Sequence, residues 1–104
     1  MFSSWRTLNV NRVPNPMSPD SPAMLDSLGW VRLRRGDAHG AVPTLERAYL
    51  IGHDAEIAAH WGEALWSSGS QTQARRVWAE ALAREPDSDA LKATLHRLLP
   101  PERP

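Results

Sequence analysis

Small residues recur along the chain at one fixed separation of 33 residues. The two sets that match are Gly29, Gly36, Ala41 and Ala48, then Gly62, Gly69, Ala74 and Ala81. Four matches at one period identify an internal repeat, and a period of this length is typical of helix–turn–helix solenoids. Such repeats present surfaces and rarely carry chemistry, so the sequence indicates an all-α architecture built for binding.

Composition excludes several classes of function. The 104 residues supply one modest core, and 12 basic and 12 acidic residues give no net charge. The chain therefore lacks the broad positive field of proteins that bind nucleic acids or anionic membranes. Without cysteine it has no disulfide, thiolate nucleophile or cysteine metal site. No apolar run suits a membrane helix or a signal peptide, so we expect a cytoplasmic protein.

Residues that start and stop helices divide the chain into five predicted helices without strands. The expected N-caps are Ser21 (with Pro22 at the first helical position), Asp37, Asp54 and Ser88. Ser70 and Gln73 have the spacing of a capping box for the fourth helix. The expected stops are Gly36, Gly52, Gly69, Pro86 and the pair Pro100 and Pro101. We expect a helical domain over residues 21–100, comprising repeats at 22–53 and 54–87 and a last helix at 88–99.

Residues 1–20 differ from the rest of the chain. Pro14, Pro16 and Pro19 forbid a regular helix and favour extended backbone. Phe2 and Trp5 are among several apolar residues in this stretch. We expect an extended or disordered leader, and the alternative is an arm that packs onto the first helix.

The repeated residues resemble those of the tetratricopeptide repeat (TPR) family from about Pro22 to Leu99. The matches are the Leu28–Gly29 pair, Gly62 after Trp61, the turn glycines Gly36 and Gly69, and alanines flanking a large residue at Ala41, Leu45 and Ala48 and at Ala74, Trp78 and Ala81. The resemblance implies two repeats plus a capping helix in a right-handed stack of about five helices. Trp61, Trp66 and Trp78 are then expected in the core.

The chain departs from the family pattern at informative positions. Arg32 stands at a site that is normally buried between repeats, and His53 replaces an expected proline, which predicts a tightened turn. Two repeats are also fewer than the roughly three that solenoids need to stand alone. The N-terminal arm, a second copy or a partner protein could cover the first helix pair, and the segment also resembles the C-terminal end of a longer repeat protein.

The resemblance implies that the first helix of each repeat lines a concave groove. The predicted lining residues are Asp26, Trp30, Leu33 and Arg34 from the first repeat and Glu56, Ala59, His60, Glu63 and Ser67 from the second. Trp30 is the expected hot spot for a peptide or partner helix, unless it packs under the arm or against a second copy. The family's clamp for a peptide carboxylate is absent. The acidic residues favour basic or apolar ligands.

Other kinds of site are less well supported. Glu56, His60 and Glu63 share one helical face, but no fourth ligand is within sequence reach, so we expect a solvated polar face and no metal or other cofactor. The cluster around Arg34 and Arg35 is explained by the helix dipole, so we expect no nucleic-acid partner. No nucleophile elbow or phosphate-binding loop indicates an enzyme.

The sequence therefore predicts a protein-interaction scaffold that binds a peptide or partner helix. The alternative is a structural role, as a self-associating or capping end of a larger repeat assembly with no separate ligand. A homo-oligomer is compatible with either function, and the identity of the partner stays open.

Overall fold

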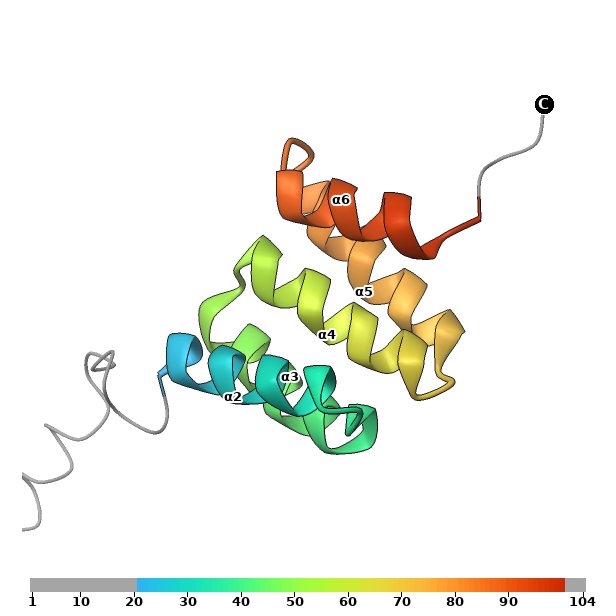
Figure 1. Ribbon diagram of the computed structural model, residues 1–104. Helices are drawn as coiled ribbons and strands as arrows, with labels where there is room; N and C mark the ends of the chain where they lie inside the picture. The colour runs from blue at the N-terminus through green and yellow to red at the C-terminus, as the bar shows by residue number, and fades with distance from the viewer. Residues whose placement is uncertain (1–20, 101–104) are drawn as a thin grey trace, which may run out of the picture.

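The computed structural model describes residues 21–100, and the predictions for residues 1–20 lie outside this part of the chain. Its helices are α2 (Pro22–Arg34), α3 (Ala38–Gly52), α4 (Ala55–Ser67), α5 (Gln71–Arg84) and α6 (Asp89–Leu98) (Figure 1). Residues 21–100 contain no strand, which confirms the all-α prediction. None of these helices is both long and apolar enough to cross a lipid bilayer.

Four of the five helix starts are capped as predicted. The side chains of Ser21, Asp37, Asp54 and Ser88 each accept a hydrogen bond from a backbone N–H in the first turn of the following helix. The capping box at Ser70 was a wrong prediction, because the Ser70 side chain makes no capping bond. Its ψ of 63° differs from the 142° of Ser21. At a similar ψ of 68°, the longer Asp37 side chain still reaches its N–H donor.

The helices form two hairpins, α2–α3 and α4–α5, with the same internal contact. Gly36 and Gly69 have φ values of 90° and 100° at the two turns, a conformation that L side chains rarely adopt. In the first hairpin a Cβ on Gly29 would lie 2.5 Å from Leu45 Cγ. In the second hairpin a Cβ on Gly62 would overlap the indole of Trp78. Both hairpins thus close around a glycine that faces a large side chain, which explains why the period places glycine there.

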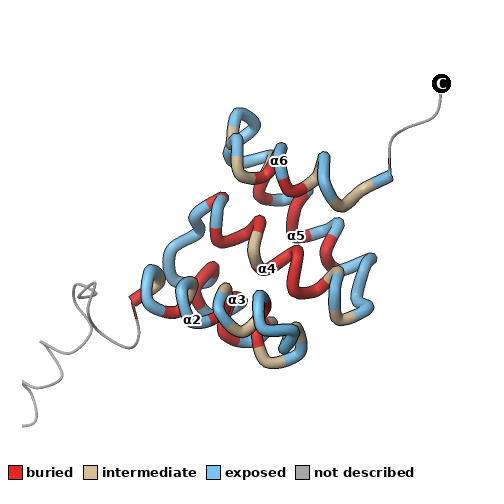
Figure 2. Tube along the Cα trace, viewed as in Figure 1, coloured by how far each residue is buried: buried red, intermediate tan, exposed pale blue. Residues whose placement is uncertain are grey.

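The core runs through the centre of the stack, where α4 packs between α3 and α5 (Figure 2). Trp61 and Trp78 are buried as predicted, whereas Trp66 is only half-buried. The guanidinium of Arg75 covers Trp66, with its Cζ 5.4 Å from the ring centroid. Trp61 and Trp78 therefore belong to the core of the second repeat, and Trp66 lies at its edge.

The connections between the hairpins differ in length. Only His53 and Asp54 separate α3 from α4, and His53 has a left-handed φ of 50° that ends α3. Four residues connect α5 to α6, which packs mainly against α4 and only lightly against α5. In the first junction α4 packs closely on α3. The equivalent contact of α6 with α5 is slight, because α6 is shifted towards α4.

Arg32 is accommodated within its own hairpin. Its Nη1 donates to Thr44 Oγ1 at 2.9 Å and to the carbonyl oxygen of Gly40 at 3.4 Å, both on α3. One repeat later the equivalent position is the buried Leu65. Hydrogen bonds to α3 thus replace the apolar packing of that position.

Tyr49 gives a test of the packing between the repeats. Its ring packs 5.6 Å from that of Trp61, and its hydroxyl is buried without a hydrogen-bond partner among residues 21–100. Burial raises the pKa of Tyr49 above 10.0, and the nearby Glu80 adds to this effect. Tyr49→Phe removes the unpaired hydroxyl, so we expect the free energy of unfolding to rise by up to about 1 kcal/mol.

The pH dependence of this variant has a defined sign. A raised pKa means that the unfolded chain ionises Tyr49 before the folded chain does, so this residue's contribution to stability is present below pH 10 and lost above it. Tyr49→Phe should lack that loss. Urea unfolding on both sides of this pH measures both effects, and a less stable variant at neutral pH would contradict the assignment.

Candidate functional site

The first helices of the two repeats bring four predicted residues together in one cluster. Asp26, Trp30 and Arg34 follow each other at one-turn intervals along α2, and His60 comes from α4. We call this set the Trp30 cluster. Because residues four apart share a helical face, the three α2 side chains form a ladder that a single α4 residue can contact.

His60 is the centre of the Trp30 cluster. Its ring stacks on that of Trp30 with centroids 4.1 Å apart and planes inclined by 27°. His60 Nδ1 lies 2.8 Å from Asp26 Oδ1, which is a hydrogen-bonding distance. The Cζ of Arg34 lies 5.4 Å from the Trp30 ring centroid. Trp30 is therefore half-buried, with the His60 imidazole stacked on its ring and the Arg34 guanidinium near it, whereas the sequence predicted an exposed side chain or one covered by the arm or a second copy.

The other predicted groove residues lie outside the Trp30 cluster. Leu33 is buried in the core, and Glu56 is exposed at the start of α4, where its backbone N–H donates to Asp54 Oδ1 at 2.7 Å. Ala59 is buried, and Ser67 is exposed at the end of α4. Only part of the predicted set therefore forms one continuous surface.

Glu63 is bound to the last helix. Its carboxylate accepts two hydrogen bonds from the Arg97 guanidinium, at 2.6 Å to Nη2 and 3.2 Å to Nη1. The Glu63 side chain is 8% exposed and that of Arg97 is 52% exposed. The hydrogen bonds that Arg97 donates to Glu63 raise the pKa of Arg97. Glu63 therefore holds α6 against α4 and does not present a free carboxylate.

The sequence analysis missed Arg97, but a signal for it exists. Asp26 contacts His60 and Glu63 contacts Arg97 at the same separation of 34 residues. In both pairs an acidic residue on one first helix contacts a basic or imidazole side chain on the next. A search for acid–base pairs one period apart, allowing a one-residue shift, would have found both.

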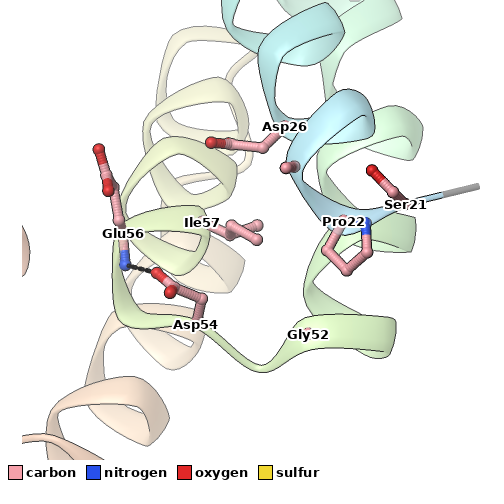
Figure 3. A pocket seen from close by; sticks show the side chains of 8 residues that line it. Ser21, Pro22, Asp26, Gly52, Asp54, Glu56 and Ile57 are labelled. Atoms are coloured by element: carbon pink, nitrogen blue, oxygen red, sulfur yellow. Dashed lines mark hydrogen bonds between the residues drawn. The ribbon is translucent and has the colours of Figure 1, made fainter. Parts of the chain in front are cut away.

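A hollow of about 460 Å³ adjoins the Trp30 cluster at the N-terminal ends of α2 and α4 (Figure 3). It is lined by Ser21, Pro22, Ala23, Asp26, Gly52, Asp54, Glu56 and Ile57. The carboxyl groups come from Asp26, Asp54 and Glu56, and no basic residue contributes to this lining. The hollow therefore combines three carboxyl groups with the apolar side chains of Pro22 and Ile57.

Glu56, His60 and Glu63, which share one face of α4, do not converge on a common point. His60 turns to Asp26 and Glu63 turns to Arg97, so neither converges with Glu56. Among residues 21–100, no group of three or more histidine or acidic side chains is placed to hold a metal ion.

Stacked helical hairpins with an internal period define the class of α-helical repeat proteins. No protein-family model matches the sequence. A curated relative, TPR repeat-containing protein PA4667 of Pseudomonas aeruginosa, is 46% identical over 88 residues. The matched region is 85% of this chain but spans only 15% of the relative. Together with the repeated glycine contacts, this similarity shows that the chain belongs to the tetratricopeptide repeat family.

Proposed function

We propose that the domain of residues 21–100 is a non-enzymatic interaction module whose α2 and α4 surface binds a peptide or partner helix. The observation that carries the proposal is the Trp30 cluster, in which the ring of a half-buried tryptophan stacks on His60 and has the Arg34 guanidinium close to it. Aromatic and arginine side chains dominate binding energies at interfaces. Because neighbouring side chains already hold Trp30, its ordering costs little on binding.

The hollow beside the cluster supports a basic or apolar ligand. Its three carboxyl groups attract a lysine or arginine side chain and repel acidic segments. A peptide lying across α2 would place an apolar residue on Trp30 and a basic residue in the hollow. We propose the cytoplasm as the location, as the sequence analysis expects.

A peptide selection tests the proposal. A random peptide library displayed on phage is selected against the immobilised chain, and the recovered peptides are synthesised and titrated calorimetrically. We expect recovered peptides to combine apolar with basic residues. Trp30→Ala should weaken their binding by about 30-fold, because truncating an interface hot spot costs about 2 kcal/mol.

Trp66→Ala is the matched control. Trp66 is also half-buried and also covered by an arginine at 5.4 Å, but it lies outside the Trp30 cluster. Circular dichroism and melting temperatures of both variants separate loss of binding from loss of fold. Equal loss of affinity in the two folded variants, or selected peptides that bind folded Trp30→Ala undiminished, would refute the proposed groove.

A further inference from the structure

The first helix carries an apolar stripe that faces away from its own hairpin. Met24, Leu28 and Val31 are spaced by four and three residues on one face of α2, and they are 42%, 44% and 47% exposed. None of them belongs to the Trp30 cluster, which occupies another face of the same helix. We call these three residues the α2 stripe.

The second repeat shows what covers such a stripe. The equivalent residues of α4, 33 positions later, are Ile57, Trp61 and Ala64, which are 6%, 8% and 0% exposed. They are buried because α4 packs on α3, where Tyr49 contacts Trp61 at 5.6 Å between ring centroids. By this equivalence, the α2 stripe is the surface on which the second helix of a preceding hairpin would pack.

The opposite end of the stack offers a surface of that kind. The repeat equivalent of α3 is α5, and Leu82 on α5 stands where Tyr49 stands on α3. Because α6 packs mainly against α4, it leaves a largely apolar hollow of about 220 Å³ beside α5. This C-terminal hollow is lined by Arg75, Trp78, Ala79, Leu82, Leu95 and Leu99.

We propose that the chain associates with a second copy of itself head to tail, with the α2 stripe of one copy seated on the C-terminal hollow of the next. Leu28 of one copy would then face Leu82 of the other, as Trp61 faces Tyr49 within the chain. The two surfaces are both apolar and lie at opposite ends of the stack (Figure 1). By the 33-residue repeat they correspond to the two sides of the contact between α3 and α4. A contact between different surfaces leaves one of each kind free, so further copies add at both ends until the assembly closes into a ring or continues as a filament.

We assign a second copy of the chain as the binding partner because each copy carries both the α2 stripe and the C-terminal hollow. Pairing two α2 stripes about a twofold axis would leave the C-terminal hollow open. Head-to-tail contact covers both surfaces and extends the number of stacked repeats beyond two, which is the condition for a stable solenoid. The proposal does not depend on the proposed groove, since the α2 stripe shares no residue with it.

Two substitutions that each block one surface test the junction. Leu28→Glu places a charge on the α2 stripe, and Ala79→Glu places one in the C-terminal hollow at an exposed position. Analytical ultracentrifugation of the full chain should show a mass that rises with concentration beyond two copies. Each variant alone should remain monomeric, and their equimolar mixture should form a two-chain species and nothing larger, because each retains the surface that the other has lost.

Leu50→Glu is the control for an added surface charge, since Leu50 is exposed on α3 and lies in neither surface. It should assemble as the parent does, and circular dichroism should show that all three variants are helical. A parent chain that is monomeric at every concentration would overturn the proposal. So would a mixture of the two blocked variants that stays monomeric, or an Ala79→Glu variant that still forms dimers, which would indicate pairing through α2 alone.

Discussion

Gly62→Ala should lower the free energy of unfolding by about 3 kcal/mol, because it forces a methyl group into a close-packed core. The new Cβ would overlap the indole of Trp78, a side chain that is only 1% exposed. Alanine would by itself favour a helix by about 1 kcal/mol over glycine, so the steric cost is larger than the net loss that is measured. Urea unfolding followed by circular dichroism gives the value.

A smaller residue at the facing position identifies the cause. In a Trp78→Leu background the indole is absent, so adding Gly62→Ala should cost much less than it does in the parent. The difference is a coupling energy of a double-mutant cycle, which residues in direct contact should show and distant residues should not. An unchanged cost in the two backgrounds would mean that the glycine is required for another reason.

The glycine–tryptophan contact also shows why the fold could be predicted from sequence. Gly29 lies opposite Leu45, and the same contact recurs 33 residues later between Gly62 and Trp78. The repeat period therefore indicates which helices approach each other closely. The helix starts could be predicted for a different reason, because a capping residue acts only on the first turn that follows it. Ser70 is the exception, since at its ψ of 63° the short serine side chain makes no capping bond, whereas the longer Asp37 side chain does so at 68°.

The site was harder to predict because its contacts join neighbouring helices. Helical spacing correctly places Asp26, Trp30 and Arg34 on one face of α2. The stacking of Trp30 on His60 depends on how far α4 is rotated and shifted relative to α2, which a one-dimensional period does not specify. The family pattern also gave no reason to expect α6 to lie mainly on α4, and that shift is what brings Arg97 to Glu63.

Arg97→Ala should lower the free energy of unfolding by about 3 kcal/mol, because it leaves a buried carboxylate without its cation. The Glu63 side chain is 8% exposed, and within residues 21–100 its carboxylate accepts its hydrogen bonds from Arg97. Because the Arg97 side chain is 52% exposed, removing its own packing contacts destabilises the fold only a little. Most of the expected loss of stability therefore comes from the unpaired Glu63 carboxylate. Urea unfolding measures the loss, and hydrogen exchange of the α6 amides locates it.

Glu63→Gln in the Arg97→Ala background separates the charge from the packing. The amide is nearly the same size but carries no charge, so the double variant should recover a large part of the lost stability. α6 should exchange faster in Arg97→Ala than in the parent, since this pair fastens it to α4 and its contact with α5 is slight. If Arg97→Ala is as stable as the parent, the carboxylate of Glu63 is hydrated and available to a ligand. The groove would then extend along α4 beyond His60, towards α6.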